Sequence, residues 1–310
     1  MAAAKQKKAP LWRRRALLGL AFLTALGLAA FLEAQFWQDG ALRDGWRLQA
    51  HGPTGRCRVI APDGATAARG FGFGSGCDAA FAALTASAGA EAEELVLLIH
   101  GLGRTPRMFR KLQPALEAPG RRVVLLRYAS LAADIRAHGD WLNRLLDGHP
   151  PVRQVSFVTH SLGGMALRAA LEQDPAWRCR LPIGAVAMLA PPNSGALLAR
   201  KLDRWTPAAL VLGPSFADLA GRGPWPADLP EELPLAIIAG GFGGKGVNPL
   251  LPGNDDGIVQ VAETRMAGAD VEILVEALHT FIADDEVAIG AIRSFLDAPL
   301  AAPKAADGCL

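Results

Sequence analysis

The chain has 310 residues, of which 51% are hydrophobic and 20% are charged, so it is long and apolar enough to form a large core. This composition excludes a disordered chain, a collagen and a small domain held together by disulfides. Six of the 32 basic residues precede the first acidic residue, Glu33, and the remaining 26 basic and 30 acidic side chains give the rest of the chain a net charge of −4. We therefore expect no nucleic-acid partner, because no positive field would attract phosphates.

An uncharged segment of seventeen residues, 16–32, lies between Arg15 and Glu33, and Trp12 and Trp37 flank it where aromatic rings favour the headgroup level. We expect residues 1–37 to form a basic cytoplasmic tail and a transmembrane anchor. A cleaved signal peptide and a buried core helix are the alternatives, but the segment is long for a signal peptide and no clear cleavage site follows it. Because basic residues stay in the cytoplasm, we expect the rest of the chain to be exported. It would face the periplasm in a Gram-negative bacterium, or be secreted or periplasmic after signal cleavage.

Residues 38–93 are expected to form an N-terminal extension with one hairpin, whose second strand and turn are RVIAPDG, and a loop at RGFGFGSG. The loop lacks the Lys-Ser/Thr ending of a phosphate-binding loop. In an exported protein, Cys57 and Cys77 can close a twenty-residue loop as a disulfide, and two buried thiols are the alternative. Cys179 and Cys309 show neither metal-ligand spacing nor the context of a nucleophile, so we assign them no role.

From residue 94 onward, short apolar runs alternate with segments of helical periodicity. This alternation predicts a parallel sheet with helices on both faces, in one domain over residues 94–298 followed by a tail at 299–310. Residues 191–234 interrupt the pattern with eight of the 22 prolines among apolar residues, and we expect a cap over a pocket there, with a packed irregular crossover as the alternative. The expected strands are 95–100, 122–128, 154–160, 183–189 and 234–240, and the expected helices are near 106–118, at 131–147 and from 162.

The strand QVSFVTH runs through Thr159-His160-Ser161-Leu162-Gly163 directly into a helix. This context predicts a nucleophile elbow, a strained turn that lifts the Ser161 hydroxyl above the sheet, although a serine at a helix start can also be only an N-cap. Thr159 stands where the pattern usually has its first glycine. Upstream, the strand LVLLIH ends in a glycine-rich turn, and the backbone N–H groups of Leu102 and Leu162 are the expected donors to an oxyanion.

An acid and a histidine follow the serine in the order that a serine hydrolase triad requires in this kind of fold. His279 is the only one of six histidines that follows the last expected strand, VEILV, and we assign it as the general base. In NDDGIVQVAET, where we expect a strand after the glycine, Asp256 is favoured over Asp255 as the acid, because it directly precedes Gly257 and the loop must turn toward His279. A surface turn is the alternative role for this segment.

Together these motifs resemble the α/β-hydrolase superfamily, and look closest to its lipase and carboxylesterase branch. The resemblance covers roughly residues 94–297 and rests on IHGLG, THSLGG, LAPPNSGA, DDGIV and LHTFI. It implies an α/β-hydrolase fold, a triad of Ser161, Asp256 and His279, oxyanion donors at Leu102 and Leu162, and no metal or cofactor. It explains neither Thr159 nor the residues that precede the sheet.

The expected activity is hydrolysis of a carboxylic ester through an acyl-enzyme intermediate. The apolar 191–234 segment and the membrane tether favour a lipid or another acyl ester as substrate. Acyl transfer or thioester cleavage on the same triad is the alternative activity, and a non-catalytic, membrane-tethered binding protein is the alternative of another class. The sequence leaves the acyl chain length, the alcohol and the oligomeric state open.

Overall fold

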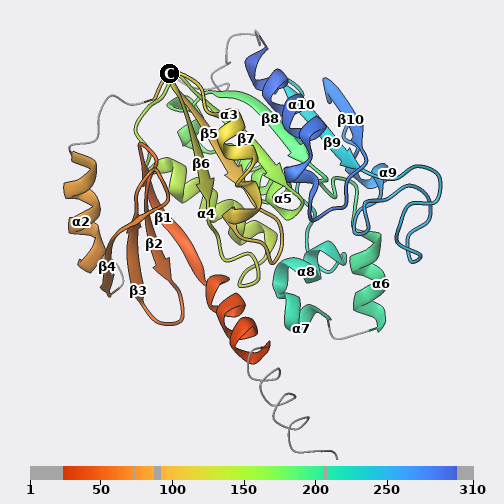
Figure 1. The fold of residues 1–310 in the computed structure, drawn as a ribbon, viewed down its shortest axis with the longest axis horizontal. Coiled ribbons are helices and arrows are strands. Elements are labelled where there is room, and N and C mark those ends of the chain that lie inside the picture. Colours follow the sequence, from red (N-terminus) through yellow and green to blue (C-terminus); the bar gives the residue numbers. More distant parts are fainter. Residues whose placement is uncertain (1–23, 73–74, 87–91, 206–207, 299–310) are drawn as a thin grey trace, which may run out of the picture.

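The computed structural model describes residues 24–72, 75–86, 92–205 and 208–298, and contains two sheets (Figure 1). The first sheet is antiparallel, has the order β1-β2-β3-β4 and is followed by helix α2. A helix over residues 24–34 leads into it. The bounds are β1 (Trp37–Arg43), β2 (Trp46–His51), β3 (Arg56–Ile60), β4 (Thr66–Phe71) and α2 (Ser75–Ala86).

The N-terminal extension contains more regular structure than the single hairpin that we expected. The segment RVIAPDG does supply a strand, β3, but as the third of four. The first part of the glycine-rich segment, expected to be a loop, instead forms the end of β4, where Gly70 pairs with Cys57 of β3. In this segment glycine alternates with Arg69 and Phe71. Successive residues of a strand point to opposite faces of the sheet, so the glycines lie on one face only, and the alternation is compatible with a strand.

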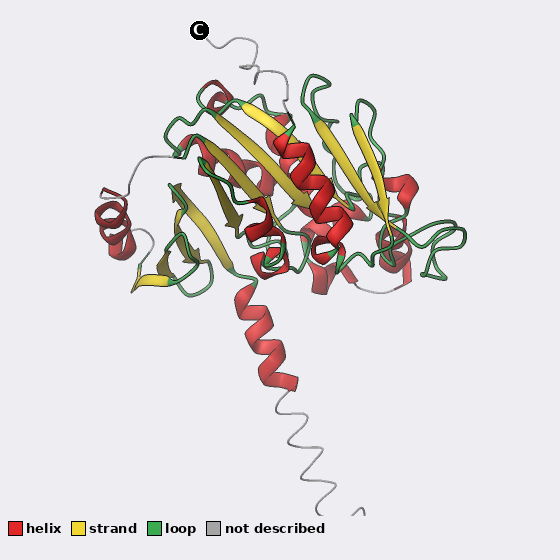
Figure 2. Cartoon of the chain, turned by 45° about the horizontal axis from the view of Figure 1, so that its top comes forward, coloured by secondary structure: helices red, strands yellow, loops and turns green. Residues whose placement is uncertain are grey.

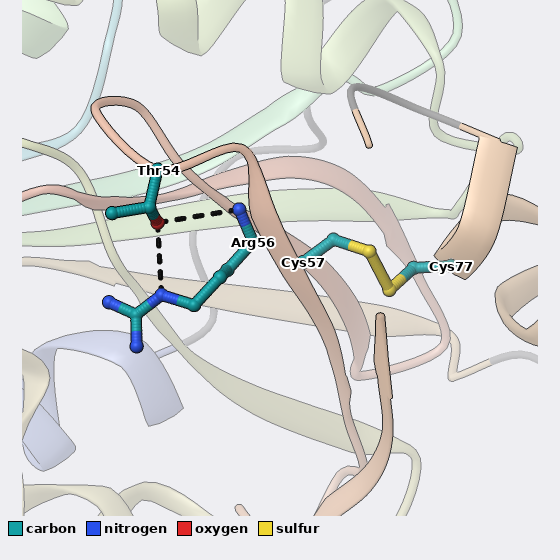
Figure 3. Close-up of a disulfide and its surroundings, with 4 residues drawn as sticks. All are labelled: Thr54, Arg56, Cys57 and Cys77. Atoms are coloured by element: carbon teal, nitrogen blue, oxygen red, sulfur yellow. Dashed lines mark hydrogen bonds between the residues drawn. A yellow bond between two sulfur atoms is a disulfide. The ribbon is translucent and has the colours of Figure 1, made fainter. Parts of the chain in front are cut away.

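A disulfide joins Cys57 on β3 to Cys77 on α2, with 6.1 Å between the Cα atoms (Figure 3). The alternative of two thiols is therefore wrong. The disulfide lies in a small apolar cluster with Val59 and Phe81, between the sheet and α2. Cys179, to which we assigned no role, is also disulfide-bonded, and Cys309 lies outside the described residues.

The second sheet has six strands, all parallel, in the order β10-β9-β8-β7-β5-β6. Its central strands are buried on both faces, which is why their sequences are continuous apolar runs. Helices α4 and α5 cover one face and α3 and α10 the other (Figure 2), as predicted. The strands are β5 (Glu94–Ile99), β6 (Arg121–Leu126), β7 (Gln154–His160), β8 (Ile183–Leu189), β9 (Leu235–Gly240) and β10 (Val271–Val275).

The helices of this domain follow the predicted order with two differences. The expected helix near 106–118 is divided into a 3-10 turn, η1, and a five-residue helix, α3, because Pro114 cannot lie in the interior of a long helix. The expected strand after Gly257 is a short helix, α9, which begins with a capping box formed by Gln260 and Glu263. The helices and turns are η1 (Pro106–Phe109), α3 (Leu112–Leu116), α4 (Ile135–Asp147), α5 (Leu162–Leu171), η2 (Ala176–Cys179), α6 (Leu197–Trp205), α7 (Ala208–Leu212), α8 (Pro214–Leu219), α9 (Val261–Thr264), η3 (Ile282–Asp284) and α10 (Glu286–Asp297).

A buried carboxylate connects the two sheets. Asp39 on β1 accepts hydrogen bonds from the backbone N–H of Arg127 (2.6 Å) and from Nε2 of Gln49 (2.7 Å). Its backbone carbonyl accepts one from the indole of Trp141 on α4 (2.6 Å). Burial raises the pKa of Asp39. These contacts fix the N-terminal sheet beside β6 and α4.

The segment expected to cross a membrane is described only in part, since residues 16–23 lie outside the described ranges. Within those ranges, no helix has both the length and the apolar character that crossing a bilayer requires. The helix over residues 24–34 exposes apolar side chains that are 42–59% accessible, namely Leu26, Leu28, Phe31 and Leu32.

Candidate active site

Ser161 occupies a strained turn between β7 and α5. Its backbone φ of 53° and ψ of −121° lie in a region that residues with a side chain seldom adopt. The turn is held by a hydrogen bond from the Ser161 backbone N–H to the carbonyl of Leu189 on the neighbouring strand β8 (2.9 Å). This is the geometry of the nucleophile elbow that the sequence predicts.

Two glycines after Ser161 allow the helix to pass close to the sheet. A Cβ atom on Gly163 would lie 2.3 Å from the carbonyl oxygen of Ile99 on β5, whereas a Cβ on Gly164 would lie 3.3 Å from Oγ1 of Thr159. Thr159, the departure from the usual pattern, is completely buried. The absence of a side chain at Gly164 leaves the space that the larger Thr159 needs.

We expect Gly163→Ala to destabilise the fold far more than Gly164→Ala. The first substitution forces a methyl group into backbone atoms and should cost about 3 kcal/mol or more, while the second requires only a shift of the Thr159 side chain. Urea denaturation of both variants measures the difference. Equal stabilities would contradict the close approach of α5 to β5.

Asp256 and His279 form a buried pair at the ends of two strands. Oδ2 of Asp256 lies 2.7 Å from Nδ1 of His279, and the two residues are 1% and 5% exposed. The other carboxylate oxygen accepts hydrogen bonds from the backbone N–H groups of Ile258 (2.9 Å) and Val259 (2.8 Å). A further bond runs from the His279 backbone N–H to the Asp256 carbonyl (2.9 Å). Ser161 and His279 line the same cavity.

Asp255, the alternative acid, forms its hydrogen bonds within its own loop instead. Its Oδ1 accepts hydrogen bonds from the backbone N–H groups of Val247 (3.3 Å), Asn248 (3.0 Å) and Gly257 (2.8 Å). The structure therefore pairs His279 with Asp256 and gives Asp255 the role of holding the 247–257 turn.

The loop after β5 carries the expected oxyanion donor Leu102 and is held from both sides. The hydroxyl of Tyr128 donates to the carbonyl of His100 (2.7 Å), and the backbone N–H of Gly103 donates to Oγ of Ser130 (3.0 Å). Leu162 begins α5, so its N–H has no acceptor within the helix. Leu102 lines the same cavity as Ser161, and Leu162 directly follows Ser161, while their role as oxyanion donors stays a prediction.

Two contacts around His279 were not anticipated from the sequence. Nε2 of His160 lies 2.9 Å from the carbonyl of His279. The guanidinium of Arg104 donates to Oγ1 of Thr280 (2.5 Å), which connects the oxyanion loop to the histidine loop. Burial lowers the pKa of His160 well below its usual value and that of His100 to about 3. Both imidazoles are thus neutral, and His160 can donate its proton to the carbonyl that it contacts.

An apolar cavity of about 210 Å³ lies over Ser161 and His279. Three helices between β8 and β9, in the segment expected to be a cap, contribute much of its wall. The cavity also touches Leu102 and Arg104 on the oxyanion loop. The side chains from the three helices are Leu198, Ala199, Leu202, Leu212, Phe216 and Leu219.

The cap segment is fixed to the domain by a buried arginine. Arg168 on α5 is 2% exposed and donates to the carbonyls of Asn193 (2.8 Å), Pro226 (2.6 Å) and Ala227 (2.9 Å), while it also pairs with Asp228 (2.7 Å). Nothing in the sequence distinguishes Arg168 from a solvated arginine, because its partners lie 25 to 60 residues away.

A parallel sheet, a serine elbow and an Asp-His pair at the carboxyl ends of the strands define the class of α/β hydrolases. The family model described as "Alpha/beta hydrolase family" matches residues 96–303, and the chain belongs to this family.

Solved structures show the same fold. The mature form of the lipase BlEst2 from Bacillus licheniformis is 17% identical, with a TM-score of 0.51 over 68% of this chain and 94% of that chain. Its propeptide form, also 17% identical, has a TM-score of 0.53 over 70% of this chain and 53% of that chain. No curated protein sequence matches the chain.

Proposed function

We propose that the chain is a serine hydrolase that cleaves carboxylic esters, with Ser161 as nucleophile, His279 as general base and Asp256 as the residue that orients His279. One observation carries this proposal: the strained Ser161 lines a single apolar cavity together with His279, whose Nδ1 is paired with Asp256. The membership in the α/β-hydrolase family supports hydrolysis as the class of reaction.

In the proposed reaction Oγ of Ser161 attacks the ester carbonyl while Nε2 of His279 takes its proton. The carbonyl oxygen becomes an oxyanion, which the backbone N–H groups of Leu102 and Leu162 stabilise, each contributing roughly 3 kcal/mol. The alcohol then leaves with the proton from His279, and an acyl-enzyme remains. Water attacks this intermediate under the same base and releases the acid.

The acyl group is proposed to occupy the apolar cavity, which favours a medium or long acyl chain over acetate. Burying each added methylene contributes about 0.8 kcal/mol, so kcat/KM for p-nitrophenyl esters should rise roughly fourfold per carbon until the cavity is full. Kinetics from acetate to decanoate, beside a phospholipid and a triglyceride, measure this dependence. A maximum at acetate without turnover of lipids would contradict an apolar acyl site.

We further propose that residues 1–37 anchor the protein in a membrane and that the catalytic domain is exported. The exposed apolar side chains of the 24–34 helix and the Cys57–Cys77 disulfide support this placement. Helix α7, which carries the exposed residues Leu210 and Val211, lies toward the same lower side of the molecule as this helix in Figure 1. After alkaline carbonate extraction the protein should stay in the membrane fraction with an intact N-terminus. Release of a shortened chain would indicate a cleaved signal peptide.

A further inference from the structure

The N-terminal sheet has two different faces at β3. Cys57 and Val59 point toward α2 and the disulfide, whereas Arg56 and Arg58 lie on the other face. In Figure 3 the Arg56 side chain and the disulfide leave the strand on opposite sides. The second face borders a cavity of about 490 Å³ that lies apart from the catalytic cavity. Its lining side chains include Glu33, Trp37, Arg56, Arg58, Arg69 and Phe71.

Two arginines on this face stand directly opposite each other. Arg58 on β3 pairs with Arg69 on β4 in the antiparallel register. Like charges at such positions destabilise a sheet, so the pair is unfavourable unless an anion lies between them. Arg56, two residues before Arg58, already pairs with Glu33 (2.7 Å).

No carboxylate within the described residues forms an ion pair with Arg58 or Arg69, although Glu33 and Asp39 lie near enough to act on the charge of Arg58. The Nε of Arg58 donates to the amide oxygen of Gln49 (2.8 Å), and its guanidinium lies 3.9 Å from the ring centre of Trp37. Gln49 in turn donates to Asp39 (2.7 Å), whose other oxygen is occupied by the backbone of Arg127. Burial, and after it the charge of Arg127, lowers the pKa of Arg58 to about 10, while the Glu33 and Asp39 carboxylates act in the opposite direction.

We propose that Arg58 and Arg69 form a binding site for the phosphate of an anionic phospholipid headgroup. Arginine matches phosphate oxygens through paired N–H groups, and the cavity is open enough to admit a headgroup. The cavity is also lined by Glu33 and Trp37, which directly follow the expected membrane segment and lie at headgroup level if the proposed anchor holds. The lipid phosphates would then lie at the height of the two arginines, and the site would fix the orientation of the catalytic domain on the membrane.

Lipid binding can be measured on the full chain in a nonionic detergent. Ser161→Ala is used as the parent, so that the lipid is not hydrolysed, and native mass spectrometry counts bound phosphatidylglycerol and phosphatidylcholine with identical acyl chains. We expect phosphatidylglycerol to bind roughly tenfold more tightly, and Arg58→Gln with Arg69→Gln to remove this preference. The matched control, Arg153→Gln with Arg293→Gln, removes the same amount of charge from exposed sites elsewhere. This control should retain the preference for phosphatidylglycerol.

Three results would overturn the site: equal affinity for the two lipids, unchanged affinity in the Arg58/Arg69 variant, or displacement of the lipid by inorganic phosphate at equal concentration. Without lipid, Arg69→Gln alone should unfold at the temperature of the parent or above it, because one of the two facing charges is gone and the contacts of Arg58 with Gln49 and Trp37 remain. Should the double variant fail to fold, Arg69→Gln alone decides, since Arg69 is exposed and forms no ion pair with the described residues. The intact mass in the same spectra shows whether residues 1–37 are retained, and binding is read without catalysis, so failure of this site is distinct from failure of the esterase or of the anchor.

Discussion

Ser161→Ala should abolish labelling by a fluorophosphonate probe and lower kcat for ester hydrolysis by roughly 10⁶-fold. The reason is that the elbow places the Ser161 hydroxyl at the cavity that His279 also lines, and alanine removes this hydroxyl. The glycines that let α5 approach β5 are unchanged in this variant, so its melting temperature should stay close to that of the parent. Removal of the Ser161 hydroxyl from the strained turn should not lower the melting temperature either.

Ser194→Ala is a suitable control for the nucleophile. Ser194 lies in the neighbouring LAPPNSGA segment, and its hydroxyl contacts only the backbone carbonyls of α9. This variant should be labelled as the parent is. Labelling that survives in Ser161→Ala would contradict the assignment of the nucleophile.

Asp256→Asn should lower kcat by roughly 10⁴-fold while KM changes little. An asparagine can still accept the hydrogen bonds from Ile258 and Val259 through its oxygen, but its amide nitrogen would face Nδ1 of His279. Since the amide donates where the carboxylate accepts, the imidazole is held in the tautomer that carries its proton on Nε2. It can then no longer take the proton from Ser161.

Asp255→Asn tests the role of the neighbouring carboxylate separately from that of Asp256. Oδ1 of Asp255 accepts hydrogen bonds from three backbone N–H groups of the 247–257 turn, and its Oδ2 is buried without a partner among the described residues. Asparagine keeps the accepting oxygen but replaces charge-assisted bonds by neutral ones and buries an amide nitrogen without an acceptor, so the free energy of unfolding should fall by about 1–3 kcal/mol while most of kcat remains. Steady-state kinetics and thermal unfolding of the two single variants give this comparison. A larger loss of kcat in Asp255→Asn than in Asp256→Asn would reverse the two assignments.

The catalytic domain could be predicted from the sequence because its signals are local. Buried parallel strands leave continuous apolar runs, and the elbow is a strand, a serine and a helix in direct succession. His279 could be singled out because it alone follows the last strand. The choice between Asp255 and Asp256 rested on one turn residue, and the hydrogen bonds now distinguish their roles.

The parts that escaped prediction depend on contacts between distant residues. Arg104 and Thr280 are 176 positions apart, and Arg168 meets its carbonyl partners 25 to 59 residues away. The N-terminal sheet was underestimated because its strands carry arginines and glycines in place of a regular apolar alternation. Its attachment to β6 depends on Asp39, a single carboxylate whose partner Arg127 lies 88 residues further along the chain.

The hydrogen bonds of Asp39 with Arg127 and Trp141 bear on how much of the chain the folded domain needs. The family match begins at residue 96, yet a chain cut there would leave the Arg127 amide and the Trp141 indole without acceptors on a newly exposed surface. The N-terminal sheet is thus part of the same folding unit as the six-stranded sheet. An expression boundary that keeps the enzyme intact therefore lies before Trp37. Residues outside the range 96–303, which the family model matches, thus stabilise the catalytic domain.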